Sequence, residues 1–246
     1  IHAADAGISV NEAVDVAREA ADFVLLEKDL SVLADGIIEG RKTFANSIKY
    51  IFISTGATFG NMFSVAGASL LLPFLPMLPK QILLTNFISD FPYLAISNDN
   101  VDAVQLEKPS RWDFRSIKLF MLIFGLHSSV FDFITFYFLF YYSRLGETAF
   151  QTGWFLESGI TELLILFIIR SRVAVFRSKP SRLLIILAIL MAMVTVSLIW
   201  SPLGHLLSLV PLNTKTLAGI SVILLSYLIT GDLLKKYFYR YINRIS

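Results

Sequence analysis

Apolar residues dominate the chain after residue 40, in six stretches that are separated by short polar or basic segments. We expect helices at about residues 41–72, 80–97, 117–142, 153–169, 183–200 and 217–234. The hydrocarbon core of a bilayer is about 30 Å thick, which an α-helix crosses in about 20 residues. The pattern therefore predicts a mainly α, polytopic membrane protein, with residues 41–246 forming a six-helix transmembrane bundle.

Residues 1–40 have a different pattern, typical of a soluble domain. Residues 6–10 and 23–26 predict short buried strands, Asn11 is placed to cap a helix that runs through Ala21, and Ser31 is placed to cap the next helix. The order strand–helix–strand–helix predicts a small parallel α/β unit. Two strands do not form a stable sheet alone, so we expect this unit to complete its sheet with residues upstream of Ile1.

The first long helix connects these two regions. No proline occurs from Ser31 to Leu72, and a helix over about residues 37–71 would be about 50 Å long. It would project roughly 20 Å beyond the hydrocarbon core and form a rigid link to the α/β unit. Gly56 and Gly60 in this helix predict a close approach of a neighbouring helix.

Basic residues predict the orientation of the spans. They gather at the start of the first helix, between the second and third, between the fourth and fifth, and in the tail, whereas the opposite side holds only Lys80, Arg144 and Lys215. By the positive-inside rule, residues 1–40 and the C-terminus are both cytoplasmic, as an even number of spans requires.

Composition supports this assignment and narrows the chemistry. Hydrophobic residues make up 55% of the chain, with 21 Phe, which is more than the core of a soluble domain needs. The absence of cysteine excludes disulfides and thiolate metal sites. Residues 1–40 contain no phosphate-binding loop, no nucleophile with a base and no metal cluster, so we predict no catalytic residue here. Membrane lipid is an expected partner, and nucleic acid is not.

The second apolar stretch carries the most informative polar residues. Asn86, Ser89 and Asp90 have the spacing i, i+3, i+4, which places their oxygens on one helical face. A carboxylate at membrane depth is costly and usually has a partner or a ligand. Pro92 lacks an N–H, so the carbonyl of Ile88 loses its helical partner. We expect unwound backbone and a cation site here; the alternative is a structural role for Asp90 against a neighbouring helix.

The first helix offers further oxygen ligands. Thr58 and Asn61 are i, i+3 neighbours, and we expect them to face Asp90. For Thr58, packing by interhelical hydrogen bonds is an equal alternative. The predicted metal ligands are therefore Asp90, Asn86 and Asn61, with Ser89 and Thr58 also in the cation site.

Three more acidic residues lie within the apolar stretches. Glu157 and Glu162 are five residues apart and point about 140° from each other, so they do not form one chelating pair. We expect Glu157 to turn toward the first two helices. Asp132 and Glu162 are further candidates, for which a structural role weighs at least as much. His127 is expected to be a bundle residue, and Asp232 to be solvated.

Two motifs resemble those of P-type ATPases. Residues 3–50, with ADAGI, EAAD, LL and EGR leading into a long helix, resemble the end of their phosphorylation domain. NFISD at residues 86–90 is similar to the N-x-x-[ST]-D of their cation-binding helix. Residues 111–142, FQTGWFLESGITE and SPLG most resemble bacterial magnesium-transporting members. Calcium pumps carry a glutamate where this chain has Asn61.

The resemblance implies that residues 1–40 end a HAD-like phosphorylation domain of an ATP-driven pump with an aspartyl-phosphate intermediate. ATP would bind upstream domains (actuator, nucleotide-binding and phosphorylation), because the D-K-T-G-T and G-D-G-x-N-D motifs are not in this sequence. Mg²⁺ would be both the transported divalent cation and the ATP cofactor, with uptake across the bacterial plasma membrane. Calcium, a monovalent cation or protons remain alternative ions, and a passive channel or secondary carrier is the alternative class.

Overall fold

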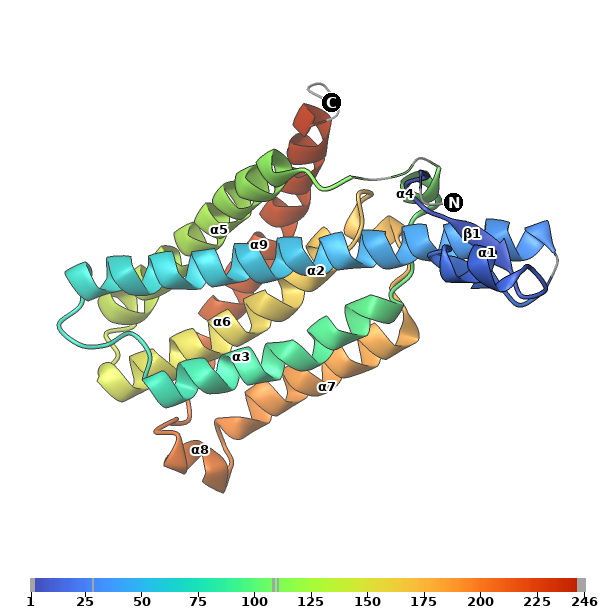
Figure 1. The fold of residues 1–246 in the computed structure, drawn as a ribbon. Helices are drawn as coiled ribbons and strands as arrows, with labels where there is room; N and C mark the ends of the chain where they lie inside the picture. Colours follow the sequence, from blue (N-terminus) through green and yellow to red (C-terminus); the bar gives the residue numbers. More distant parts are fainter. Residues whose placement is uncertain (1–2, 28, 108, 110, 243–246) are drawn as a thin grey trace.

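The structure is a computed structural model that describes residues 3–27, 29–107, 109 and 111–242. Within these residues, six helices of 16 to 42 residues lie side by side in a bundle (Figure 1). They are α2 (Leu30–Leu71), α3 (Pro79–Leu94), α5 (Phe114–Tyr137), α6 (Glu147–Ile169), α7 (Arg182–Leu198) and α9 (Thr214–Ile242). Short turns of helix join them, namely η1 (Ala95–Asn98), α4 (Ala103–Leu106), the π-helical η2 (Phe138–Tyr142), η3 (Val175–Arg177) and α8 (Pro202–Leu206).

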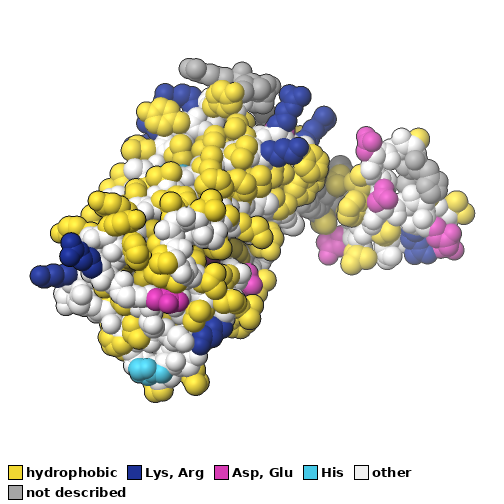
Figure 2. Space-filling view, turned by 90° about the vertical axis from the view of Figure 1, so that its left-hand side faces the viewer, with side chains coloured by type: hydrophobic (Ala, Val, Ile, Leu, Met, Phe, Trp, Pro, Cys, Tyr) yellow, Lys and Arg dark blue, Asp and Glu magenta, His cyan; other side chains and the backbone are white. Residues whose placement is uncertain are grey.

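The N-terminal unit consists of β1 (Ile8–Val10), α1 (Asp15–Glu19) and β2 (Phe23–Leu25). The predicted parallel pairing is confirmed, with Ile8 opposite Phe23. The prediction that both strands are buried was wrong: Phe23 in β2 is 63% exposed and Ile8 in β1 is 39% exposed, in a sheet that has only two strands among the described residues. The unit lies apart from the bundle (Figure 2).

Both predicted helix caps in this unit were displaced. Asn11 lies in a turn after β1, and α1 begins later, after Val14, without a side-chain cap. The cap of α2 is Asp29, whose carboxylate accepts a 2.8 Å hydrogen bond from the Ser31 N–H. Asp29 and Ser31 are both good capping residues, and the one nearer the end of β2 is used. This hydrogen bond holds the pKa of Asp29 below its usual range.

Helix α2 is the longest element, and its 42 residues correspond to about 60 Å. It begins beside the N-terminal unit and runs the length of the bundle (Figure 1). The predicted close approach is confirmed at Gly60, where an added Cβ would lie 3.1 Å from the Gly125 carbonyl of α5. The Ser129 hydroxyl of α5 also donates a 3.0 Å hydrogen bond to the Gly60 carbonyl. Gly125 is also a glycine, and an added Cβ there would lie 3.3 Å from Gly60 N, so glycines on both helices let the two backbones approach.

Among the described residues, three helical segments are long and apolar enough to cross a bilayer: 114–142, 147–169 and 214–242. Helix α7 is apolar but has only 17 residues, and α3 has 16 and carries Asn86 and Asp90. The six-span topology therefore stays a prediction. The surface of the bundle in Figure 2 is largely hydrophobic, as expected of a surface that meets lipid.

The expected unwinding around Pro92 was wrong. Helix α3 stays α-helical through Leu94 and then tightens into the 3₁₀ turn η1. Pro92 lies two residues before the end of α3, so its missing N–H removes a hydrogen bond only in the last turn. The polar face of α3 is consequently presented by regular helix.

Candidate cation-binding site

A cavity of about 620 Å³ lies between α2, α3 and α6, and polar side chains from all three helices line it. Five predicted site residues meet there, namely Thr58, Asn61, Asn86, Ser89 and Asp90. Two regular helices explain this meeting, because i, i+3 spacing on α2 and i, i+3, i+4 spacing on α3 each keep their polar residues on one face. The predicted convergence of these two faces is thus found in the structure.

Asp90 is exposed at the surface of this cavity. Within the described part of the chain, no salt bridge or hydrogen bond engages its carboxylate, so the structural alternative of a neighbouring helix that satisfies it is not observed. Ser89 is buried, and its hydroxyl donates a 2.9 Å hydrogen bond to the Asn86 carbonyl one turn earlier. The hydroxyl oxygen keeps its own acceptor capacity.

The third wall of the cavity contributes Glu162, where the sequence favoured Glu157. Asn61 on α2 donates a 2.6 Å hydrogen bond from Nδ2 to Glu162 Oε1. Glu162 is 5% exposed, and its Oε2 has no hydrogen-bond partner among the described residues. Since the Asn61 amide nitrogen is used toward Glu162, its Oδ1 remains an acceptor. The cavity therefore combines two carboxylates with amide and hydroxyl oxygens.

The other two candidate carboxylates form a separate buried cluster. Asp132 on α5 accepts hydrogen bonds from the Ser64 hydroxyl at 2.6 Å and from Trp154 Nε1 at 2.7 Å. Glu157 lies beside Asp132 and has no exposed surface. Neither residue lines the large cavity. The structure thus divides the four predicted carboxylates into two pairs, Asp90 with Glu162 and Asp132 with Glu157.

Two polar cavity residues, Ser54 and Tyr93, were missed by sequence reasoning. A signal existed for Tyr93, because it follows Ser89 by four residues and Asp90 by three and so shares their helical face. Ser54 lies four residues before Thr58 on α2, which is the same relationship.

A second unanticipated feature is an ion-pair network at the end of the bundle nearer the N-terminal unit. The carboxylate of Asp99 accepts hydrogen bonds from Lys49 Nζ at 3.1 Å, from Arg170 Nε at 2.8 Å and from the Ser181 N–H at 3.0 Å. Asp99 and Arg170 are almost completely buried. This network ties α2, the segment after η1, the end of α6 and the start of α7 together. In the sequence, Lys49 and Arg170 belong to the basic groups that predict the orientation of the spans, and nothing there indicates that they share a carboxylate.

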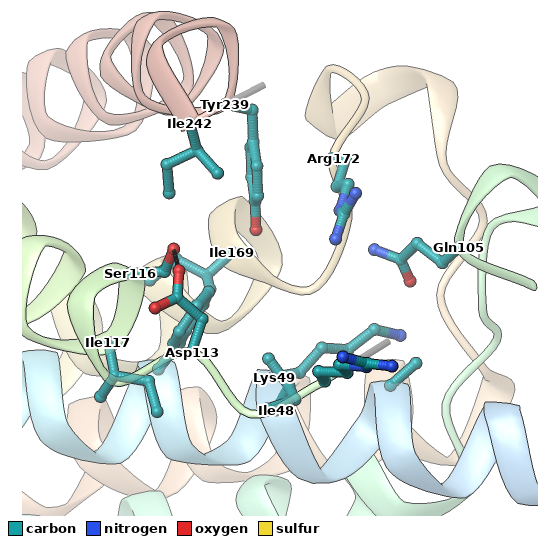
Figure 3. A pocket seen from close by; sticks show the side chains of 13 residues that line it. Ile48, Lys49, Gln105, Asp113, Ser116, Ile117, Ile169, Arg172, Tyr239 and Ile242 are labelled. Atoms are coloured by element: carbon teal, nitrogen blue, oxygen red, sulfur yellow. Dashed lines mark hydrogen bonds between the residues drawn. The ribbon is translucent and has the colours of Figure 1, made fainter. Parts of the chain in front are cut away.

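Beside this network lies a cavity of about 240 Å³ (Figure 3). Lys49, Arg111 and Arg172 line it, and the Arg172 guanidinium carbon lies 5.4 Å from the centre of the Tyr239 ring. Among the described residues, the carboxylate that lines it is Asp113, which accepts hydrogen bonds from the Ser116 hydroxyl and the Arg115 N–H; these hold the pKa of Asp113 below its usual range. A positively lined cavity disfavours a divalent cation.

His127 and Asp232 have structural contacts. His127 Nε2 lies 2.9 Å from the Thr230 hydroxyl and joins α5 to α9, as expected of a bundle residue. The expectation that Asp232 is solvated holds only in part, since its side chain is 25% exposed. Its carboxylate pairs with the buried Lys235 at 2.8 Å and accepts the Val175 N–H at 3.1 Å, because η3 folds over this end of α9.

Comparison with known proteins identifies the family. A family model described as "Cation transporting ATPase, C-terminus" matches residues 74–237. The chain belongs to this family. The matched residues include α3 and α6, which are the helices that supply Asp90 and Glu162 to the cavity.

Individual relatives that match the chain are also named as cation-transporting ATPases. The chain is 43% identical over 245 residues to "Magnesium-transporting ATPase, P-type 1" of Escherichia coli (strain K12), which is 98% of this chain and 27% of that protein. It is 34% identical over 182 residues to "Putative cation-transporting ATPase MJ1226" of Methanocaldococcus jannaschii, which is 74% of this chain and 22% of that protein. It is 24% identical over 249 residues to "Calcium-transporting ATPase" of Bacillus subtilis (strain 168), which is 96% of this chain and 28% of that protein. The chain thus spans about a quarter of the length of these relatives.

Proposed function

We propose that this chain is the transport portion of an ATP-driven P-type pump that moves Mg²⁺ into the bacterial cytoplasm. The observation that carries the proposal is the cavity between α2, α3 and α6, in which Asp90 and Glu162 lie with Asn61, Asn86, Ser89 and Thr58. The 43% identity to a magnesium-transporting ATPase over 98% of the chain supports the choice of ion.

In this proposal Asp90 and Glu162 supply the two negative charges that balance a divalent cation. The amide oxygens of Asn61 and Asn86 and the hydroxyls of Ser89 and Thr58 supply neutral ligands. Mg²⁺ dehydrates reluctantly and usually keeps several waters, so it needs few protein carboxylates. A cavity of about 620 Å³ leaves room for an ion together with part of its hydration shell. Glu162 thus takes the role that the sequence suggested for Glu157.

Calcium is the second candidate ion, because a calcium-transporting ATPase is among the relatives. Ca²⁺ takes six to eight oxygen ligands and favours several carboxylates. The cavity contains only Asp90 and Glu162 as carboxylates among the described residues, and Asn61 contributes an uncharged side chain. This donor set favours Mg²⁺.

The coupling to ATP follows from the long helix. Residues 1–40 would end a HAD-like phosphorylation domain, and ATP hydrolysis would occur on upstream domains of the full-length protein, so this chain alone would be inactive. Helix α2 begins beside the N-terminal unit and carries Asn61 at the cavity, so a shift of α2 would reach the ion directly. In this scheme six helices span the membrane with both ends cytoplasmic.

The test uses the full-length protein in sealed lipid vesicles. ATP-dependent movement of Mg²⁺ and of Ca²⁺ is followed separately with ion-selective dyes, because Mg²⁺ is also needed as the ATP cofactor. The proposal predicts movement of Mg²⁺ that Asp90→Asn abolishes. Movement of Ca²⁺ alone would change the ion, and ion movement without ATP would indicate a channel or a secondary carrier.

A further inference from the structure

Asp132 and Glu157 are two buried carboxyl groups that the proposed ion cavity does not use. Asp132 is 2% exposed and Glu157 has no exposed surface. They come from different helices, α5 and α6, and their carboxyl groups lie beside each other. The hydrophobic cluster around them includes Phe136 and Trp154, so water does not solvate either group.

The hydrogen bonds of the two groups are unequal. Both Asp132 oxygens are used, one by the Ser64 hydroxyl at 2.6 Å and the other by Trp154 Nε1 at 2.7 Å. Both Glu157 oxygens, in contrast, lack a hydrogen-bond donor among the described residues. A buried carboxylate without any donor is strongly disfavoured, whereas a neutral carboxylic acid can itself donate to a neighbouring oxygen.

The charges around the pair do not stabilise two carboxylates. In the part of the chain that the structure describes, no Lys or Arg forms a salt bridge with Asp132 or Glu157. The other titratable side chains nearby are Glu162 on α6, Tyr227 on α9 and His127, which packs against Tyr227. Helix α2 contributes Ser64, which does not titrate in this range. Two adjacent carboxylates without a cation cannot both stay ionised.

We infer that Asp132 and Glu157 form a proton-binding site that holds one proton between them, separate from the ion cavity. Asp132, with its two donors, is the better carboxylate, and Glu157 carries the proton and donates it toward Asp132. The ligand is a single proton. This inference does not depend on which ion the cavity binds.

A small gap lies beside the ion cavity, and its described lining includes Asn61 and Glu162 but neither Asp132 nor Glu157. It has about 10 Å³ of space, enough for about one water, and Thr161, Glu162, Ser128 and Tyr227 line it together with Asn61. Thr161 lies one turn after Glu157 on α6, and its hydroxyl donates a 3.0 Å hydrogen bond to the Glu157 carbonyl. Because Asp132 and Glu162 also interact electrostatically, a cation beside Glu162 would favour release of the proton from the pair.

The test is infrared spectroscopy of the full-length protein in lipid nanodiscs, where a protonated carboxyl group absorbs apart from carboxylates. At neutral pH we expect a protonated-carboxyl band that loses one group's intensity in Glu157→Gln, because Asp132 keeps its two donors, gains the new amide and stays ionised. In Asp132→Asn the band should remain and change frequency, because Glu157 stays buried without a cation and donates its proton to the new amide oxygen. Asp90→Asn is the matched control and keeps this component.

Ser64→Ala retains both carboxyl groups and removes one donor from Asp132, so it should shift the frequency of the band without removing it. This variant keeps the test valid if Glu157→Gln or Asp132→Asn fails to fold. An unchanged band in all three variants would overturn the inference. A second contradicting result would be a bound Mn²⁺ ion, detected by electron paramagnetic resonance, that is lost in Glu157→Gln and in Asp132→Asn but kept in Asp90→Asn. The pair would then be a metal site.

Discussion

Asn61 on α2 donates a 2.6 Å hydrogen bond to Glu162 on α6, and both side chains line the cavity that also contains Asp90. The bond links the helix that begins beside the N-terminal unit to one of the two proposed charged ligands. It fixes the Asn61 amide so that its oxygen is free for an ion.

Asn61→Ala should therefore raise the half-saturating Mg²⁺ concentration for transport about tenfold, or roughly 1.4 kcal/mol, because an oxygen ligand and the orientation of Glu162 are lost together. ATP-dependent Mg²⁺ movement in vesicles measures this. Ser69→Ala is the control, since Ser69 is an exposed residue of the same helix that bonds only the Ala66 carbonyl. Equal half-saturating concentrations in both variants would assign Asn61 to packing.

Glu162→Gln should weaken Mg²⁺ binding more, by about 10- to 100-fold, since one of the two proposed countercharges to a divalent ion disappears. The measurement is the half-saturating Mg²⁺ concentration, or loss of transport if the shift exceeds the accessible range. Glu147→Gln at the exposed start of α6 is the control. Wild-type Mg²⁺ affinity in the Glu162→Gln protein would show that Glu162 is not an ion ligand and would favour Glu157 in that role.

Asp99→Asn should destabilise the bundle strongly. It leaves Lys49 and Arg170 buried without their common carboxylate, a change that typically costs about 3–5 kcal/mol. Thermal unfolding in detergent should show a clear fall in Tm. Asp113→Asn, at an exposed helix cap, should leave the Tm nearly unchanged, because Asn caps a helix about as well as Asp. Similar Tm values for the two variants would show that the Asp99 network is dispensable.

Gly60→Leu should disrupt packing of α2 on α5, because even a Cβ at this position lies 3.1 Å from the Gly125 carbonyl and from Ser128 Cβ. Gly36→Ala is a matched control in the same helix, since an added Cβ there has nothing within 4 Å. We expect a lower Tm for Gly60→Leu and an unchanged or slightly higher Tm for Gly36→Ala, which gains helix propensity. The reverse order would contradict the close approach of the two helices.

Residues that share one regular helix were the most predictable part of the site. The spacing of Asn86, Ser89 and Asp90 fixes their common face wherever α3 packs, and the same holds for Thr58 and Asn61 on α2. The choice between Glu157 and Glu162 was not predictable in this way. Both lie on α6, and the rotation of this helix depends on long-range packing, such as Gly159 against Thr195 of α7.

The remaining differences also have tertiary causes. Pro92 suggests a break when its local effect is considered alone, but it lies so near the end of α3 that only the last turn is affected. The ion pairs of Asp99 join residues 50 and 71 positions apart in sequence, which no local pattern reveals. The presence of a helix, and the residues that share one of its faces, can be predicted from the periodicity of the sequence. Contacts between helices depend on how the helices pack in the fold.

The central claim is that Asp90 binds the transported ion. ATP-dependent movement of Mg²⁺ by the full-length protein, out of sealed vesicles toward the side on which ATP is added, tests it most directly, with Asp90→Asn compared with wild type and with Asp113→Asn, at equal amounts of membrane-inserted protein. We predict that Asp90→Asn abolishes Mg²⁺ movement while Asp113→Asn retains it. Wild-type Mg²⁺ movement by the Asp90→Asn protein would contradict the account.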